Sequence, residues 1–80
     1  MESEWARFDT ETPQTLGRRL RKIRRHMDLT QKEFAALFDL KREAYANYEI
    51  DKTEPTLDTI CKMCRVLNVS ADFLLGLNEE

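Results

Sequence analysis

The chain has 80 residues and a formal net charge of −2. A chain of this length supports one domain with a modest core, and we expect no room for a second, ligand-sensing domain. No apolar run approaches the roughly 20 residues of a membrane span, and the residues after Met1 do not form a signal peptide. The composition therefore predicts a single cytoplasmic domain that does not bind membranes.

The charges are distributed unevenly along the chain. Residues 1–14 and 57–80 are acidic, whereas residues 15–56 hold ten Lys or Arg against seven Asp or Glu. A negative total argues against a nucleic-acid binder, but a locally positive field can steer an anionic partner even when the total is negative. The middle of the chain is therefore the expected binding region.

Cys61 and Cys64 form the only C-x-x-C pair, and His26 is the only histidine. A four-coordinate zinc site would lack two ligands, so we expect no metal and no cofactor. Both cysteines are interpreted as small apolar residues of an amphipathic helix.

Hydrophobic periodicity predicts five helices between an N-terminal arm, residues 1–14, and a short tail, residues 78–80. The first helix is expected to begin between Pro13 and Leu16, with Thr15 as the alternative cap, and to end at Asp28. Most of its arginines are interpreted as a solvated surface. Its expected core stripe is Leu16, Leu20, Ile23 and Met27.

The second helix should begin at a capping box formed by Thr30 and Glu33, and should end near Asp39 or Leu40. The third should run from Arg42 to Glu49 or Ile50. The expected inward side chains of these two helices are Phe34, Ala35, Phe38, Tyr45 and Tyr48.

Pro55 and Thr56 open the fourth predicted helix, and Ser70 caps a short fifth helix that closes at Gly76. The expected buried stripe of the fourth helix is Leu57, Ile60, Cys64 and Leu67. No strand pattern appears. The expected fold is all-α, a compact five-helix bundle over residues 15–77 in which the second and third helices form a helix-turn-helix.

These residues resemble the lambda-repressor and Cro-like helix-turn-helix family, also called the Xre type, from about Leu16 to Gly76. The motifs that carry the resemblance are Leu29-Thr30-Gln31, Ala35, Tyr45-Ala46-Asn47-Tyr48-Glu49, Lys52-x-x-Pro55-Thr56-Leu57 and Leu67-x-Val69-Ser70-x-Asp72-x-Leu74-Leu75-Gly76. The resemblance implies a lambda repressor-like DNA-binding domain whose third helix enters the major groove of double-stranded DNA.

The resemblance implies base-reading roles for Lys41, Arg42, Glu43 and Asn47. Arg42 can grip guanine, Asn47 can pair with adenine, and Glu43 can accept from cytosine or simply favour the positive end of the helix dipole.

Phosphate contacts are implied for Gln31, Lys52 and Thr53, whose alternative role is that of plain exposed polar residues. Arg24 and Glu49 match a structural ion pair, and Arg24 can also touch phosphate.

The chain departs from the family where glycine is common, because Asp28, Asp39 and Asp51 occupy those turns. Aspartate adopts the left-handed conformation at some energetic cost, and two of these carboxylates should weaken phosphate binding. Lys41 replaces the usual Ser or Thr cap of the third helix.

Three apolar residues, Leu37, Phe73 and Leu77, do not fit the predicted core and suggest the interface of a homodimer on an inverted-repeat operator. The competing interpretation is a monomer in which the N-terminal arm covers this patch. The leading hypothesis is a sequence-specific transcriptional regulator, a repressor acting by occlusion. The alternative is an antitoxin or another protein-interaction module whose main partner is a protein. An enzyme is not expected, because the chain has one histidine, no glycine-rich phosphate loop and no recognisable pair of catalytic carboxylates.

Overall fold

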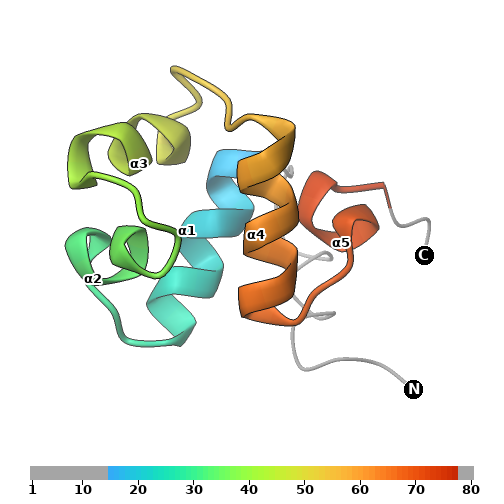
Figure 1. Ribbon diagram of the computed structural model, residues 1–80, viewed down its shortest axis with the longest axis horizontal. Coiled ribbons are helices and arrows are strands. Elements are labelled where there is room, and N and C mark those ends of the chain that lie inside the picture. Colours follow the sequence, from blue (N-terminus) through green and yellow to red (C-terminus); the bar gives the residue numbers. More distant parts are fainter. Residues whose placement is uncertain (1–14, 78–80) are drawn as a thin grey trace.

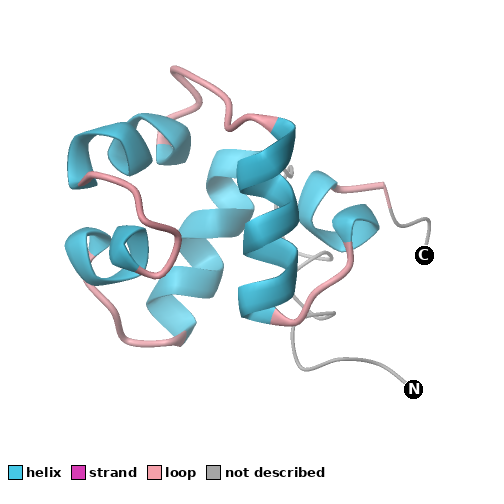
Figure 2. Cartoon of the chain, viewed as in Figure 1, coloured by secondary structure: helices cyan, strands magenta, loops and turns pink. Residues whose placement is uncertain are grey.

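The computed structural model describes residues 15–77, which form five helices and no strand (Figures 1 and 2). The arm and the tail expected at residues 1–14 and 78–80 lie outside the described residues. In Figure 1, α2 and α3 lie together at one end of the molecule and α5 at the other, with α1 and α4 between them. The helices are α1 (Leu16–His26), α2 (Gln31–Ala36), α3 (Arg42–Glu49), α4 (Leu57–Leu67) and α5 (Ala71–Leu75).

Four of the five helices begin at a hydroxyl side chain that accepts a hydrogen bond from a backbone N–H of the first turn. Thr15 is the cap of α1, so the helix begins at Leu16, within the range expected from the sequence. Thr30 and Glu33 form the predicted capping box. Lys41 caps α3 without a side-chain hydrogen bond, as expected for a residue that cannot accept one. The other two caps are Thr56 and Ser70.

The turns between helices contain left-handed residues. The predicted positions Asp28, Asp39 and Asp51 have φ angles of 60°, 59° and 59°. Asn68, which ends α4 with φ 58°, was not singled out from the sequence. Asp and Asn tolerate this conformation better than most other side chains, so the chain forms these turns without glycine.

The core is a single cluster to which every helix contributes. Phe34 is its centre in the helix-turn-helix, since its ring lies 5.1 Å from that of Phe38 and 5.2 Å from that of Tyr45. The buried apolar residues are Leu20, Ile23, Phe34, Ala35, Phe38, Tyr45, Met63, Leu67, Phe73 and Leu74.

The predicted end of α2 was wrong. The helix stops at Ala36, and the next three residues form a tight turn in which each N–H bonds a carbonyl three residues earlier. This turn still directs Phe38 into the core, which is why apolar spacing alone did not distinguish it from a continued helix.

The expected stripes of the first and fourth helices also need correction. Leu57 is 77% exposed because it is the first residue of α4 and lies beyond the core, and Met63 is buried in its place. Met27 is 37% exposed at the end of α1. Phe73, expected at the surface, is buried in the core.

One arginine of α1 is buried, contrary to the expected solvated surface. The guanidinium of Arg19 lies 5.5 Å from the centre of the Phe73 ring. It also lies against the backbone of Gly76, where an added Cβ would come within 3.2 Å of Arg19. Burial lowers the pKa of Arg19 from its ordinary value. Arg19 thus joins α1 to the end of α5.

Gly17 permits the close approach of α1 and the end of α3. A Cβ at this position would lie 2.2 Å from the Tyr48 carbonyl oxygen and 2.8 Å from that of Glu49. Both obstacles are backbone atoms, so α1 and α3 would have to separate. No helix within residues 15–77 has the length and hydrophobicity needed to span a membrane.

We predict that Gly17→Ala destabilises the protein by about 1 to 3 kcal/mol, because overpacking outweighs the helix propensity that alanine adds. Thermal and urea unfolding followed by circular dichroism measure this change. A variant as stable as the wild type, or more stable, would contradict the close approach, since helix propensity alone predicts stabilisation by up to about 1 kcal/mol.

Candidate nucleic-acid interface

An ion pair joins α1 to the last residue of α3. Arg24 Nε donates to Glu49 Oε2 at 2.6 Å, and Arg24 Nη2 donates to Glu49 Oε1 at 3.3 Å. Both side chains are largely shielded from solvent, at 14% and 4% exposure. Arg24 Nη1 also donates to the backbone carbonyl of Leu29 at 2.9 Å, immediately before α2. One guanidinium therefore contacts α3 and the chain entering α2 at the same time.

Glu49 accepts further hydrogen bonds from the core side and from α2. The hydroxyl of buried Tyr45 donates to Glu49 Oε2, and Gln31 Nε2 donates to Glu49 Oε1 at 3.0 Å. Burial by itself would raise the pKa of Glu49, but the hydrogen bonds from Arg24, Tyr45 and Gln31 hold it below its ordinary value. Burial and the bond to Glu49 raise the pKa of Tyr45. Glu49 is therefore a carboxylate in the folded protein.

The side chain of Gln31 links this buried carboxylate to the surface of α3. Its amide nitrogen donates to Glu49, and its carbonyl Oε1 accepts from Arg42 Nη1 at 3.2 Å. The sequence predicted only a phosphate contact for Gln31. The bridge was missed because it connects residues 11 and 18 positions apart, which no local pattern reveals.

The candidate base-reading residues lie on α3 or at its start. Lys41, Arg42 and Glu43 are exposed in the first turn, and Asn47 is half-buried one turn later. The backbone N–H of Lys52 donates to the Asn47 carbonyl at 2.9 Å, which folds the following loop back onto the helix. The side chains of Lys52 and Thr53 are exposed on that loop.

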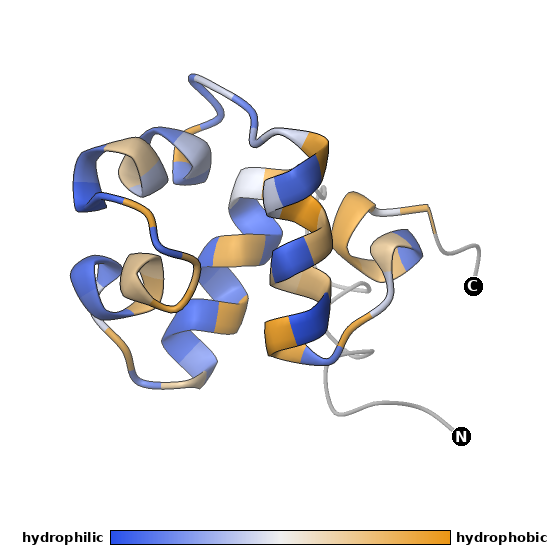
Figure 3. Ribbon diagram, in the orientation of Figure 1, coloured by the Kyte–Doolittle hydropathy of each residue, from blue (hydrophilic) through white to orange (hydrophobic). Residues whose placement is uncertain are grey.

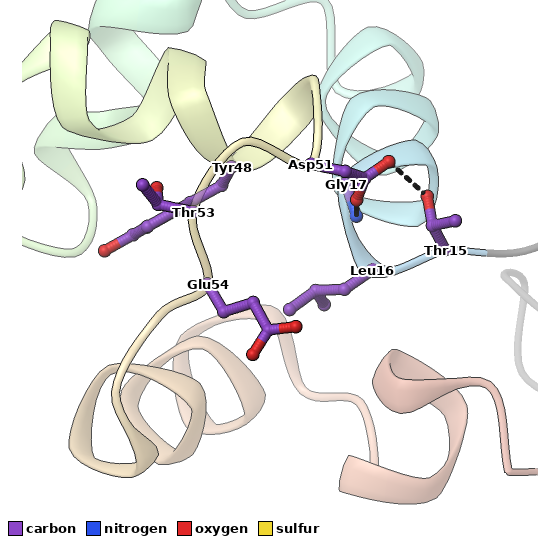
Figure 4. A pocket seen from close by; sticks show the side chains of 7 residues that line it. All are labelled: Thr15, Leu16, Gly17, Tyr48, Asp51, Thr53 and Glu54. Carbon is purple, nitrogen blue, oxygen red and sulfur yellow. Dashed lines mark hydrogen bonds between the residues drawn. The ribbon is translucent and has the colours of Figure 1, made fainter.

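Two of the aspartates in the turns form side-chain contacts with other helices. Asp51 accepts hydrogen bonds from Thr15 Oγ1 at 2.8 Å and from the backbone N–H of Gly17 at 3.1 Å (Figure 4). Its carboxylate thus satisfies the positive end of α1. Asp39 forms an ion pair with Lys62 on α4, and this contact lowers the pKa of Asp39. Neither role was anticipated from the sequence.

A hollow of about 250 Å³ lies beside the Asp51 contact, between the start of α1 and the loop after α3 (Figure 4). Its polar lining consists of two threonines, Tyr48, Asp51 and Glu54. Asp51 is already engaged by α1, so this hollow is a consequence of helix packing.

We predict that the free energy of unfolding falls with pH once Glu49 begins to bind protons. In the unfolded chain Glu49 titrates near pH 4.3, whereas its pKa in the folded protein is lower. Its contribution is therefore complete above that pH and decreases as pH falls through the folded pKa. Urea unfolding at a series of pH values between 7 and 3 measures the loss.

The matched variant is Glu49→Gln, which keeps the shape of the side chain and cannot titrate. It should be less stable than the wild type by roughly 3 kcal/mol at pH 7, because Arg24 loses its charged partner. Its stability should change less with pH below about 4.5. Parallel pH profiles for the two proteins would show that Glu49 is not the linked group.

Comparison with known proteins agrees with this geometry. The helix-turn-helix family model matches residues 20–74. The chain is 40% identical over 65 residues to the HTH-type transcriptional regulator ImmR of Bacillus subtilis (strain 168), covering 81% of this chain and 51% of that protein. It is 42% identical over 59 residues to the SPbeta prophage-derived uncharacterized HTH-type transcriptional regulator YonR of the same organism, covering 74% and 55%.

The chain spans about half the length of these curated relatives. Among solved structures, the P22 c2 repressor protein in complex with synthetic operator 9T in the presence of Tl+ matches with a TM-score of 0.75 and 24% identity. That match covers 82% of this chain and 100% of the other and confirms the fold. The chain therefore belongs to the helix-turn-helix family, in its lambda-repressor and Cro-like branch, as the sequence motifs indicated.

Proposed function

We propose that this protein is a sequence-specific DNA-binding regulator of transcription that acts as a repressor. The single observation that carries the proposal is the rigid attachment of α3. Its last residue is buried and bonded to Arg24, Tyr45 and Gln31, while its first turn is exposed and free to enter a groove. The matched relatives are described as transcriptional regulators, and the structural neighbour is a repressor bound to operator DNA.

Base recognition is assigned to the exposed side of α3. Arg42 carries two parallel donors suited to guanine O6 and N7, and Asn47 has the paired donor and acceptor suited to adenine. Lys41 and Glu43 flank Arg42 in the same turn. Gln31 Oε1 accepts a hydrogen bond from Arg42 Nη1, and this contact would reduce the conformational entropy lost when Arg42 binds a base.

Phosphate contacts are assigned to Gln31 and to the loop after α3. Gln31 is the first residue of α2, where free backbone N–H groups favour an anion. Lys52 and Thr53 are exposed and held next to α3 by the bond to the Asn47 carbonyl. These contacts would position the protein on the duplex without reading its sequence.

We further propose that two copies bind an inverted repeat, each α3 reading one half-site. Large exposed apolar residues on α4 and after α5 support this proposal, since Leu57 is 77% and Leu77 62% exposed. Phe73 is buried and is not part of such an interface, while Leu37 is 38% exposed on the turn after α2. Bound near a promoter in the cytoplasm, such a dimer would block RNA polymerase by occupying its site.

The same exposed apolar residues favour the second candidate function, a protein-interaction module of the antitoxin kind. In that case Leu57 and Leu77 would contact a different protein, and DNA binding would be secondary. We assign no catalytic activity; of the two carboxylates that line the hollow at the start of α1, Asp51 is already bonded to the α1 backbone.

We predict that Arg42→Ala and Asn47→Ala each weaken binding to the preferred duplex by about 1 to 3 kcal/mol, or roughly 5- to 150-fold. The preferred duplex is first selected from a random-sequence pool with the wild-type protein. Fluorescence anisotropy then measures affinity for that duplex and for a scrambled one. The variants should lose affinity for the selected duplex and keep most of their affinity for the scrambled one.

Arg65→Ala is the matched control, since Arg65 is an exposed arginine of α4 away from α3. It should bind the selected duplex as the wild type does. The same titration gives the stoichiometry, for which two chains per selected site are expected. Equal affinity of wild type and both variants would contradict the assigned reading surface, and no binding at low salt would favour the protein-interaction function.

A further inference from the structure

The side of α1 that faces away from the core carries a row of cations, which we name the α1 basic ridge: Arg18, Arg21, Lys22 and Arg25. Positions three and four residues apart lie on one side of an α-helix, so these four side chains are neighbours. They surround a shallow depression of about 200 Å³. The three arginines are exposed and Lys22 is half-buried. Figure 3 shows α1 hydrophilic along most of its length.

No acidic residue lies on α1, so the ridge has no compensating charge within its own helix. Within residues 15–77, the side chains of Arg18, Arg21 and Arg25 form no ion pair. Like charges one turn apart destabilise a helix by roughly 0.2 to 0.5 kcal/mol per pair. The three arginines of the ridge therefore repel one another in the free protein, and an anionic partner would relieve the repulsion.

The surface that would face DNA lacks a positive excess of its own. Residues 41–54 hold three cations and four carboxylates. If Glu49 is left out because Arg24 neutralises it, three cations face three carboxylates and the net charge of this segment is zero. Attraction to the phosphate backbone supplies essentially all of non-specific DNA binding and a large part of specific binding. The cations for that attraction must therefore come from outside the reading segment, and α1 has six Lys or Arg and no acid.

The ridge lies next to the elements that would contact DNA. Arg24 is adjacent in sequence to Arg25 and one turn from Arg21, and its own guanidinium contacts the end of α3 and the carbonyl before α2. Gly17, the residue before Arg18, is buried and contacts the end of α3. The ridge is thus adjacent, on α1, to the residues that contact α3 and the start of α2.

We infer that the α1 basic ridge binds backbone phosphates of the DNA duplex beside the segment read by α3, and so supplies the electrostatic part of the affinity. This inference rests on the proposed DNA-binding function. Guanidinium groups bind phosphate oxygens through two parallel donors. From position 18 to position 25 the helix rises about 10 Å, and a duplex presents about six phosphates over that length. The strand that faces the helix presents about three of them, a number comparable to the four ridge cations, and the position of the ridge beside Arg24 favours DNA over an acidic peptide segment.

The test uses a 30-base-pair duplex of random sequence, so that no operator need be known. Dissociation constants are measured between 50 and 200 mM salt for the wild type, Arg21→Gln, Arg25→Gln and the double variant. Each lost phosphate contact should reduce the slope of log affinity against log salt by about 0.9. The double variant should therefore lose about 1.8 from the slope, and its affinity at 50 mM salt should fall more than tenfold.

Arg65→Gln is the control: it removes the same charge from α4 and should leave the slope of log affinity against log salt unchanged. Circular dichroism and thermal unfolding verify that all variants fold. A double variant with the wild-type slope would overturn the inference while leaving the proposed function intact. An equal loss for Arg65→Gln would overturn it as well, because the effect would then be one of net charge. Competition by polyglutamate as strong as by duplex of equal charge would overturn it in favour of an acidic protein partner. A wild type that binds no duplex would overturn both proposals.

Discussion

The ion pair between Arg24 and Glu49 is the contact on which the arrangement of the first three helices depends. It joins the last turn of α1 to the end of α3, and the same guanidinium donates to the carbonyl that leads into α2. Buried ion pairs contribute little net stability compared with well-packed apolar groups, because both charges lose their hydration. In some proteins such pairs instead specify one arrangement of helices over others. Here the three guanidinium nitrogens of Arg24 and the two carboxylate oxygens of Glu49 take part in five hydrogen bonds that connect α1, α2 and α3.

For the proposed function, the consequence is that the proposed reading surface is connected to the core by hydrogen bonds as well as by packing. Tyr45 is fully buried, packs against the ring of Phe34 and donates a hydrogen bond to Glu49. Gln31 donates to Glu49 and accepts from Arg42, so it connects the two side chains. A base-reading arginine on a free helix would sample many rotamers. In this protein one hydrogen bond, from Arg42 Nη1 to Gln31, favours one orientation of the guanidinium, which suits the proposed base-reading role.

Much of the fold could be predicted from the sequence because its signals are local. The capping box at Thr30, the cap at Ser70 and the left-handed turns at Asp28, Asp39 and Asp51 all depend on residues within a few positions. The predictions that failed depend on contacts between helices that are distant in the sequence. Arg19 and Phe73 were expected at the surface, and only their mutual packing between α1 and α5 explains their burial.

The candidate site was only partly accessible to sequence reasoning for the same reason. The pairing of Arg24 with Glu49 was suggested by family resemblance and not by spacing, since 25 positions separate the two residues. The bonds from Asp51 to the start of α1, and from Gln31 to Arg42, link segments whose contact follows from the packed fold. A polar residue in a turn gives no local sign of which distant helix it will contact.

A double-mutant cycle on Arg24 and Glu49 tests this account most directly. Urea unfolding at pH 7 would compare the wild type, Arg24→Met, Glu49→Gln and the double variant. If the pair positions three helices, each single substitution should be strongly destabilising. The double variant should be more stable than the summed effects of the two single substitutions predict, by a coupling energy of about 1.5 to 3 kcal/mol. Additive effects, with a coupling energy below about 0.5 kcal/mol, would contradict it.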